Sequence, residues 1–132
     1  MSFILDTSTL IEVENGNEEI IEKILDLKKT SQTELAITIF TFCEFYYGII
    51  QKSEKFKLKA LERLHQYTLI QTTEQSAKIF CELLSQMKKM GVAVTQFDLF
   101  IASLVIEHSY TLITLDQDFE QIPGLKKIIL KS

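Results

Sequence analysis

Five acidic residues of this chain stand next to short apolar stretches, where their carboxylates could do chemistry together. They are Asp6, Glu44, Asp98, Asp116 and Asp118. Carboxylates that crowd together repel one another and are costly to remove from water, so such a cluster persists chiefly when a cation neutralises it. Oxygen ligands without a paired His or Cys favour hard ions such as Mg²⁺ or Mn²⁺ over Zn²⁺. The sequence therefore points to a divalent metal site, provided that the fold brings these acids together.

Apolar strands that alternate with amphipathic helices would position these acids. The predicted strands cover residues 3–5, 35–39, 67–70, 110–114 and 127–130. The predicted helices cover residues 10–13, 17–29, 41–51, 54–65 and 74–90, with a further, largely apolar helix from residue 98. Strands separated by helices imply a parallel sheet covered on both faces. The predicted fold class is α/β, a three-layer α/β/α sandwich around a central, mostly parallel sheet of about five strands, in one domain over residues 1–132.

The predicted sheet would gather the acids at one edge. In a parallel sheet the carboxyl ends of the strands and the amino ends of the following helices lie on the same edge, where ligands bind. Asp6 ends the first strand, Glu44 lies in the first predicted turn of the helix over 41–51, and Asp98 opens the apolar helix. Asp116 and Asp118 follow the fourth strand. Four separate segments thus each bring an acid to this edge.

Each acid also has a purely structural interpretation. Glu44 completes the pattern Thr41-x-x-Glu44, which is a helix capping box, and Asp98 fits a helix cap. Asp116 and Asp118 fit ordinary turn positions. Capping favours acids at this edge of a sheet, but it does not explain why four segments supply one there.

Composition limits the classes of function. With 46% hydrophobic and 24% charged residues among 132, the chain has the composition of a globular protein. Its net charge of −4 argues against gripping nucleic acid by bulk electrostatics, but a local metal site can still be neutral or positive. No apolar run approaches the roughly 18 residues needed to span a bilayer, so we expect a cytoplasmic protein without a membrane segment.

Two pairs of residues have a structural and a functional interpretation. Cys43 and Cys81 lie in helical patterns without metal-ligand spacing, which favours buried, reduced thiols. Tyr46 and Tyr47 could stack on bases, but aromatic residues near a strand–helix junction more often belong to the core. We therefore expect both pairs to be buried.

Four ordered motifs resemble those of the PIN-domain family, and in particular the VapC-type toxins of toxin–antitoxin pairs. They are Ile4-Leu5-Asp6-Thr7-Ser8, Thr41-x-x-Glu44-Phe45-Tyr46-Tyr47-Gly48, Asp98-Leu99-Phe100-Ile101-Ala102, and Thr114-Leu115-Asp116-Gln117-Asp118-Phe119 with Ile122-Pro123-Gly124-Leu125 after it. The motifs occur in the family order and span nearly the whole chain. One departure is the segment over residues 91–96, which lacks the proline often seen before the third acid.

The resemblance implies a PIN-like fold and a Mg²⁺- or Mn²⁺-dependent endoribonuclease that hydrolyses RNA phosphodiester bonds. It further implies a homodimer held inactive by a cognate, VapB-like antitoxin. No motif encodes which RNA is cleaved, because single-stranded RNA is recognised by shape and stacking. The lysines between Lys52 and Lys59 are predicted to hold the RNA backbone.

The resemblance also implies residue roles. The catalytic acids carried over are Asp6, Glu44, Asp98 and Asp116. Asp6, Asp98 and Asp116 would hold the metal with Glu44 close by, Asp118 would share or replace the role of Asp116, and the hydroxyls of Thr7 and Thr114 would support the metal shell.

Two other classes of function remain open. A Mg²⁺-dependent phosphatase also uses an aspartate after the first strand, but the haloacid-dehalogenase pattern needs a second aspartate where Ser8 stands. A non-catalytic protein- or RNA-binding module on the same fold would tolerate the loss of acids that this chain retains. Cleavage of RNA that depends on metal separates the nuclease from this module.

Overall fold

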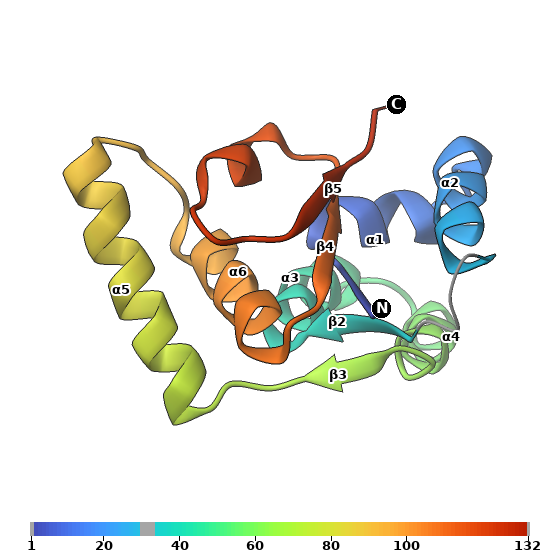
Figure 1. Cartoon of the computed structure of the whole chain (residues 1–132). Coiled ribbons are helices and arrows are strands. Elements are labelled where there is room, and N and C mark those ends of the chain that lie inside the picture. The colour runs from blue at the N-terminus through green and yellow to red at the C-terminus, as the bar shows by residue number, and fades with distance from the viewer. Residues whose placement is uncertain (1, 30–33, 132) are drawn as a thin grey trace.

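A five-stranded parallel sheet forms the centre of the computed structural model, which describes residues 2–29 and 34–131 (Figure 1). The strands are β1 (Phe3–Leu5), β2 (Leu35–Thr38), β3 (Thr68–Ile70), β4 (Thr111–Thr114) and β5 (Lys127–Ile129). Their spatial order is β3-β2-β1-β4-β5, and each neighbouring pair is parallel. The prediction of a parallel sheet with about five strands is confirmed.

Over the described residues, six α-helices and one short 3₁₀-helix surround this sheet. They are α1 (Thr7–Glu14), α2 (Glu18–Lys29), α3 (Ile39–Ile49), α4 (Glu54–Leu64), α5 (Glu74–Met90), α6 (Gln96–His108) and η1 (Gln117–Gln121). The bounds of α5 agree with the prediction, and Gly91 ends that helix in the left-handed conformation with a φ of 71°. The predicted helix over 10–13 was too short, because the Asp6 side chain caps a helix that begins at Thr7.

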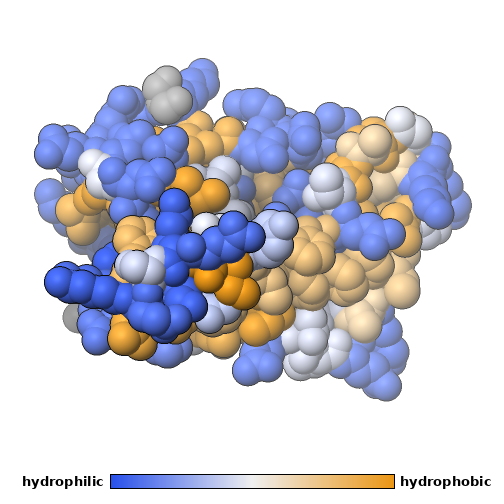
Figure 2. Space-filling view, turned by 180° about the vertical axis from the view of Figure 1, so that it is seen from behind, coloured by the Kyte–Doolittle hydropathy of each residue, from blue (hydrophilic) through white to orange (hydrophobic). Residues whose placement is uncertain are grey.

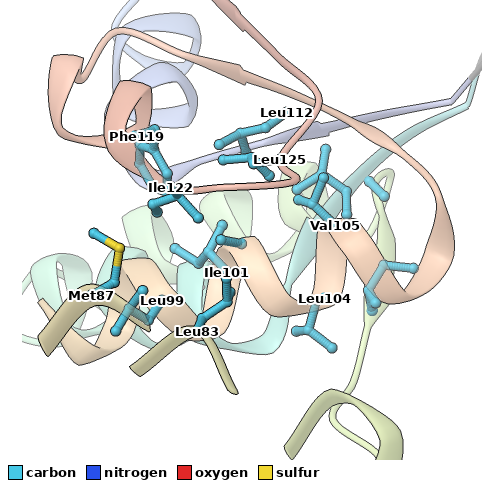
Figure 3. Close-up of a cluster of buried hydrophobic side chains, with 14 residues drawn as sticks. Leu83, Met87, Leu99, Ile101, Leu104, Val105, Leu112, Phe119, Ile122 and Leu125 are labelled. Atoms are coloured by element: carbon cyan, nitrogen blue, oxygen red, sulfur yellow. The ribbon is translucent and has the colours of Figure 1, made fainter. Parts of the chain in front are cut away.

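Alternate residues of the central strands fill cores on opposite faces of the sheet. On one face Ile4 and Leu112 pack with buried residues of α5 and α6 and with Phe119 of η1 (Figure 3). On the other face Phe3 and Leu5 pack with buried residues of α1, α2 and α4. This alternation is the period of two that a strand imposes, and it produces the three-layer α/β/α sandwich predicted from the sequence.

The helix α6 is buried on almost every side, as its composition predicts. Its buried residues are Leu99, Ile101, Ala102, Ser103, Leu104 and Val105. The one polar member, Ser103, donates a hydrogen bond of 2.7 Å to the carbonyl of Leu99, so its hydroxyl does not lack a partner in the core. A helix fixed in this way gives Asp98, in its first turn, a rigid support.

Both cysteines are exposed, so the prediction that they are buried thiols is wrong. Cys81 lies on α5, which packs mainly against α6 and therefore buries only a narrow stripe that includes Leu83 and Met87. Cys43 lies on α3 next to the candidate acid Glu44. Tyr47, which was expected in the core, is 82% exposed.

No helix in the part of the chain that the structure describes is long and apolar enough to cross a membrane.

Candidate metal and nuclease site

The carboxylate of Asp6 is buried at the carboxyl end of β1 and is held by hydrogen bonds from three residues of two segments, α1 and β4. Only 3% of the residue is exposed. The hydroxyl of Thr114, at the end of β4, donates to Oδ2 at 2.6 Å, and the amide of Thr9 donates to Oδ1 at 3.0 Å. The Ser8 hydroxyl lies 2.9 Å from both carboxylate oxygens. Asp6 is thus fixed in position before any ligand arrives.

Burial raises the pKa of Asp6 above its ordinary value, although the hydrogen bonds from Thr114, Thr9 and Ser8 act in the opposite direction. Loss of hydration therefore disfavours the charged form more than these donors stabilise it. A nearby cation would stabilise the charged form of this buried carboxylate, because it supplies the charge compensation that water no longer provides.

Glu44 is tied to the same edge of the sheet by the hydroxyl of Thr7, which donates to its Oε1 at 2.6 Å. The helix α3 is capped by Thr38, so Glu44 lies in its second turn and not in its first. The capping-box interpretation of Thr41-x-x-Glu44 is therefore wrong, because Thr41 is already inside the helix. Instead, the buried hydroxyl of Thr41 lies 3.3 Å from that of Thr7 and 3.4 Å from that of Thr38.

The carboxyl group of Asp98 is the most strongly perturbed of the acids at this edge. Thr95 caps α6 and its hydroxyl accepts a hydrogen bond from the Asp98 amide at 3.2 Å, so the interpretation of Asp98 as the cap itself is wrong. Burial raises the pKa of Asp98 to about 6, a hydrogen bond to Thr95 opposes this, and the charges of Asp116, Glu44 and Asp6 raise it further. The four acids of the predicted cluster are therefore near enough to repel one another.

Asp116, rather than Asp118, joins this cluster. Asp116 caps η1, and its side chain accepts a hydrogen bond of 2.9 Å from the amide of Asp118, so the turn interpretation is correct for its local role. The Asp116 amide donates to the hydroxyl of Thr114 at 2.9 Å, and that same hydroxyl donates to Asp6. Asp118 is exposed and is not among the acids that raise the pKa of Asp98.

The donor chemistry of the cluster fits a hard divalent cation, whereas its present side-chain positions do not form a closed metal shell. Within residues 2–29 and 34–131, no three His, Cys, Asp or Glu side chains are arranged to hold a metal ion. The candidate donors are all carboxylate oxygens. Burial raises the pKa of Asp6 and of Asp98, and the neighbouring acids raise that of Asp98 further. Mg²⁺ and Mn²⁺ prefer such oxygen ligands, and coordination would require the side chains to turn toward a common point.

Three hydroxyl residues of the site were not predicted from the sequence to support the acids. Ser8 contacts Asp6 and also accepts a hydrogen bond of 3.4 Å from the amide of Leu115. Thr38 and Thr41 lie behind the contact between Thr7 and Glu44. The sequence does contain a hydroxyl residue within one helical turn of each acid. Such residues are common as caps at helix starts, so this pattern alone does not predict that they support the acids.

Replacing Thr114 by valine is expected to destabilise the protein by roughly 1.5–3 kcal/mol, since it removes a hydrogen bond to a buried charged group. Urea unfolding near neutral pH measures this free energy. The matched control is Thr114→Ser, which keeps the hydroxyl and should retain most of the stability. Equal losses in the two variants would show that the methyl group matters and that the hydroxyl does not.

Comparison with known proteins gives a match over nearly the whole chain. The family model described as "PIN domain" matches residues 3–125. The protein named Ribonuclease VapC3 of Methanocaldococcus jannaschii is 29% identical over 104 residues, which cover 79% of this chain and 98% of the relative. The matched region contains every acid of the candidate site.

Solved structures share the fold. VapBC2 from Rickettsia felis, bound to a DNA fragment from its promoter, has a chain that superposes with a TM-score of 0.87 at 23% identity, covering 99% of this chain and 100% of that one. VapBC-5 from Mycobacterium tuberculosis, described as a member of the VapBC family of toxin-antitoxin systems, gives a TM-score of 0.72 at 21% identity over 99% and 98% of the two chains. These likenesses agree with the sheet order and layers described above.

Proposed function

This chain belongs to the PIN domain family, and on that premise we propose that it is a metal-dependent endoribonuclease that hydrolyses phosphodiester bonds of cytoplasmic RNA. The observation that carries the proposal is that the hydroxyl of Thr114 bonds both the Asp6 side chain and the Asp116 amide, while the hydroxyl of Thr7 holds Glu44 at the same edge of the sheet. The raised pKa of Asp98, to which the charges of the other three acids contribute, supports it. A carboxylate cluster with this property calls for a cation. The relative named Ribonuclease VapC3 supports RNA as the substrate.

In this proposal Asp6, Asp98 and Asp116 hold Mg²⁺ or Mn²⁺, with Glu44 close by. The bound metal would lower the pKa of a water molecule and stabilise charge on the attacked phosphate. The chain itself supplies the positioning: Thr114 and Ser8 hold Asp6, and Thr7 holds Glu44. Because hydroxyl partners of this kind orient metal ligands, their loss should lower metal affinity or activity about 10- to 100-fold.

We further infer that the protein is the toxin of a type II toxin–antitoxin pair and acts as a homodimer that a VapB-like antitoxin inhibits. The similarity to VapBC chains supports this inference. A groove of about 300 Å³ includes Glu44 in its lining, which is partly apolar (Ile11, Phe45, Ile49 and Phe56) and partly charged (Glu14, Lys52 and Arg63). A protein partner that placed apolar side chains in this groove would cover the nearby acids.

The proposal is tested by incubating an end-labelled, structured RNA with the protein in Mn²⁺ or in excess EDTA. We expect cleavage in Mn²⁺ alone, with products that carry 5′-phosphate and 3′-hydroxyl ends, because water attacks and the ribose 2′-hydroxyl does not. Mass spectrometry of the fragments identifies the ends. Cleavage that persists in EDTA, or 2′,3′-cyclic phosphate ends, would contradict the mechanism. Absence of cleavage for any RNA would favour a non-catalytic binding module. The phosphatase alternative has lost its support, since the family model matches a PIN domain.

A further inference from the structure

Tyr47 is the most exposed of the large aromatic residues on α3. Its exposed fraction is 82%, whereas the neighbouring Tyr46 is half-buried and stacks on Phe42 with ring centroids 5.9 Å apart. Within the part of the chain that the structure describes, the Tyr47 side chain makes no ring contact and no hydrogen bond. An aromatic ring left free in this way gives nothing to the core, so its role must be sought on the surface.

The helix spacing places Tyr47 on the same face of α3 as the acid Glu44. Residues 40, 44 and 47 are separated by four and three positions, so Phe40, Glu44 and Tyr47 lie along one face of α3. At the other end of this row the ring of Phe40 contacts Phe97 with centroids 5.4 Å apart and planes inclined by 66°. Phe97 directly precedes Asp98 and is 41% exposed. An exposed aromatic residue thus shares a face of α3 with Glu44, and another directly precedes Asp98 on α6.

The side of the molecule opposite to the view of Figure 1 has a broad hydrophobic area (Figure 2). It lies beside a strongly hydrophilic region on the same side, so the apolar surface is not scattered evenly over the molecule. The rings of Phe40, Phe100 and Phe80 stack in series between α3, α6 and α5, with centroids 4.6 and 3.8 Å apart. This packing fixes Phe40 and therefore the orientation of the α3 face that also carries Glu44 and Tyr47.

A substrate with unstacked bases suits this arrangement. The protein carries a net charge of −4, so bulk electrostatics cannot hold RNA near the acids. Base stacking on aromatic side chains does not depend on charge, and every base offers a face for it. Bases are available for stacking where RNA is single-stranded, because a duplex keeps them inside.

We propose that Tyr47 and Phe97 are specificity-determining residues that stack on bases of single-stranded RNA on the two sides of the phosphate to be cleaved. This inference rests on the proposed ribonuclease function and names the conformation of the substrate that the site accepts. A second copy of the chain or a protein partner seated on Tyr47 is the competing occupant that the experiment separates.

The first measurement is the kinetics of cleavage of a single-stranded RNA by variants at position 47. Tyr47→Ala is expected to raise KM roughly tenfold while kcat changes little, since removal of one stacked base contact weakens binding. Tyr47→Phe and Tyr47→Trp keep a ring and should retain the wild-type KM. Tyr47→Leu keeps an apolar side chain without a ring and should behave like Tyr47→Ala. Leu25→Ala, at a half-exposed apolar position on α2, is the matched control and should leave KM unchanged.

The second measurement reports stacking without cleavage. An RNA oligonucleotide with 2-aminopurine loses fluorescence when that base stacks, and the cleavage-deficient Asp98→Asn protein serves as the background for the binding measurement. We expect quenching that disappears with Tyr47→Ala and returns with Tyr47→Trp. Light scattering after gel filtration should give the same mass for all Tyr47 variants.

The outcomes separate this inference from the proposed function. If wild-type protein cleaves RNA in Mn²⁺ but Tyr47→Ala keeps the wild-type KM and quenching, the inference is overturned and the nuclease stands. If Tyr47→Ala changes the mass of the particle and Tyr47→Leu restores it, the surface binds protein and the inference is overturned. If wild-type protein neither cleaves nor quenches the oligonucleotide, both are overturned.

Discussion

Replacing Asp98 by asparagine is expected to lower the rate of RNA cleavage by on the order of 10²–10³, the range seen when one preorganised electrostatic group is removed from an active site. The same replacement should raise the midpoint of thermal unfolding of the metal-free protein. The reason is that the pKa of Asp98 is raised to about 6, so at neutral pH the fold holds a carboxylate that burial and the neighbouring acids disfavour. Asparagine removes the charge and keeps the shape.

Initial cleavage rates and differential scanning calorimetry measure these two effects on the same protein preparation. Asp118→Asn is the matched control, because Asp118 is an exposed acid a short distance along the chain from Asp116 and does not act on Asp98. It should change neither quantity appreciably. An Asp98→Asn protein with wild-type cleavage would remove Asp98 from the mechanism, and a lower unfolding midpoint would show that its charge stabilises the fold.

Stability of the metal-free protein is expected to fall as pH rises from about 5 to about 7.5. The folded-state pKa values of Asp98 and Asp6 lie above the ordinary value of 3.8, so the folded protein binds these protons more tightly than the unfolded chain does. For Asp98 the resulting stabilisation is complete below about pH 4 and is lost as pH rises through about 6. Added Mg²⁺ should reverse the loss near pH 7.5, by about 2.7 kcal/mol at a hundred times its dissociation constant.

Urea unfolding at several pH values, in EDTA and in Mg²⁺, measures this dependence. The slope of stability against pH between about 5 and 7 should be smaller in Asp98→Asn than in the wild-type protein. The electrostatic description of the site would be contradicted if Asp98 made the metal-free protein more stable as pH rises over this range. It would also be contradicted if Mg²⁺ did not stabilise the protein at the low or the high end of the range.

The sequence predicted the framework of the site because strand and helix periodicity are local properties. Ile4 and Leu5 point to opposite faces of the sheet because successive strand residues alternate. The short apolar stretch that ends in Asp6 was therefore enough to predict the strand, without any knowledge of tertiary contacts. Once the strands are taken as parallel, the position of Asp98 at the start of an apolar helix places it on the same edge.

The details of capping and exposure could not be predicted in the same way. Thr38 and Thr41 are both hydroxyl residues near the start of α3, and only the end of β2 decides that Thr38 is the cap. The choice between Asp116 and Asp118 depends on the path of η1, which is too short to leave a periodic signal. The exposure of Tyr47 depends on which neighbours cover α3, and the sequence of α3 alone does not contain that information.

The most direct test of the central claim, that carboxylates from four segments form one cation site, is calorimetric titration of Mn²⁺ into the protein without RNA. We predict saturable binding by wild-type protein, weakened about 10-fold or more in Asp6→Asn and in Asp98→Asn, and unchanged in Asp118→Asn. If the wild-type protein binds no Mn²⁺, or if Asp6→Asn and Asp98→Asn bind it as tightly as the wild type, the claim is contradicted.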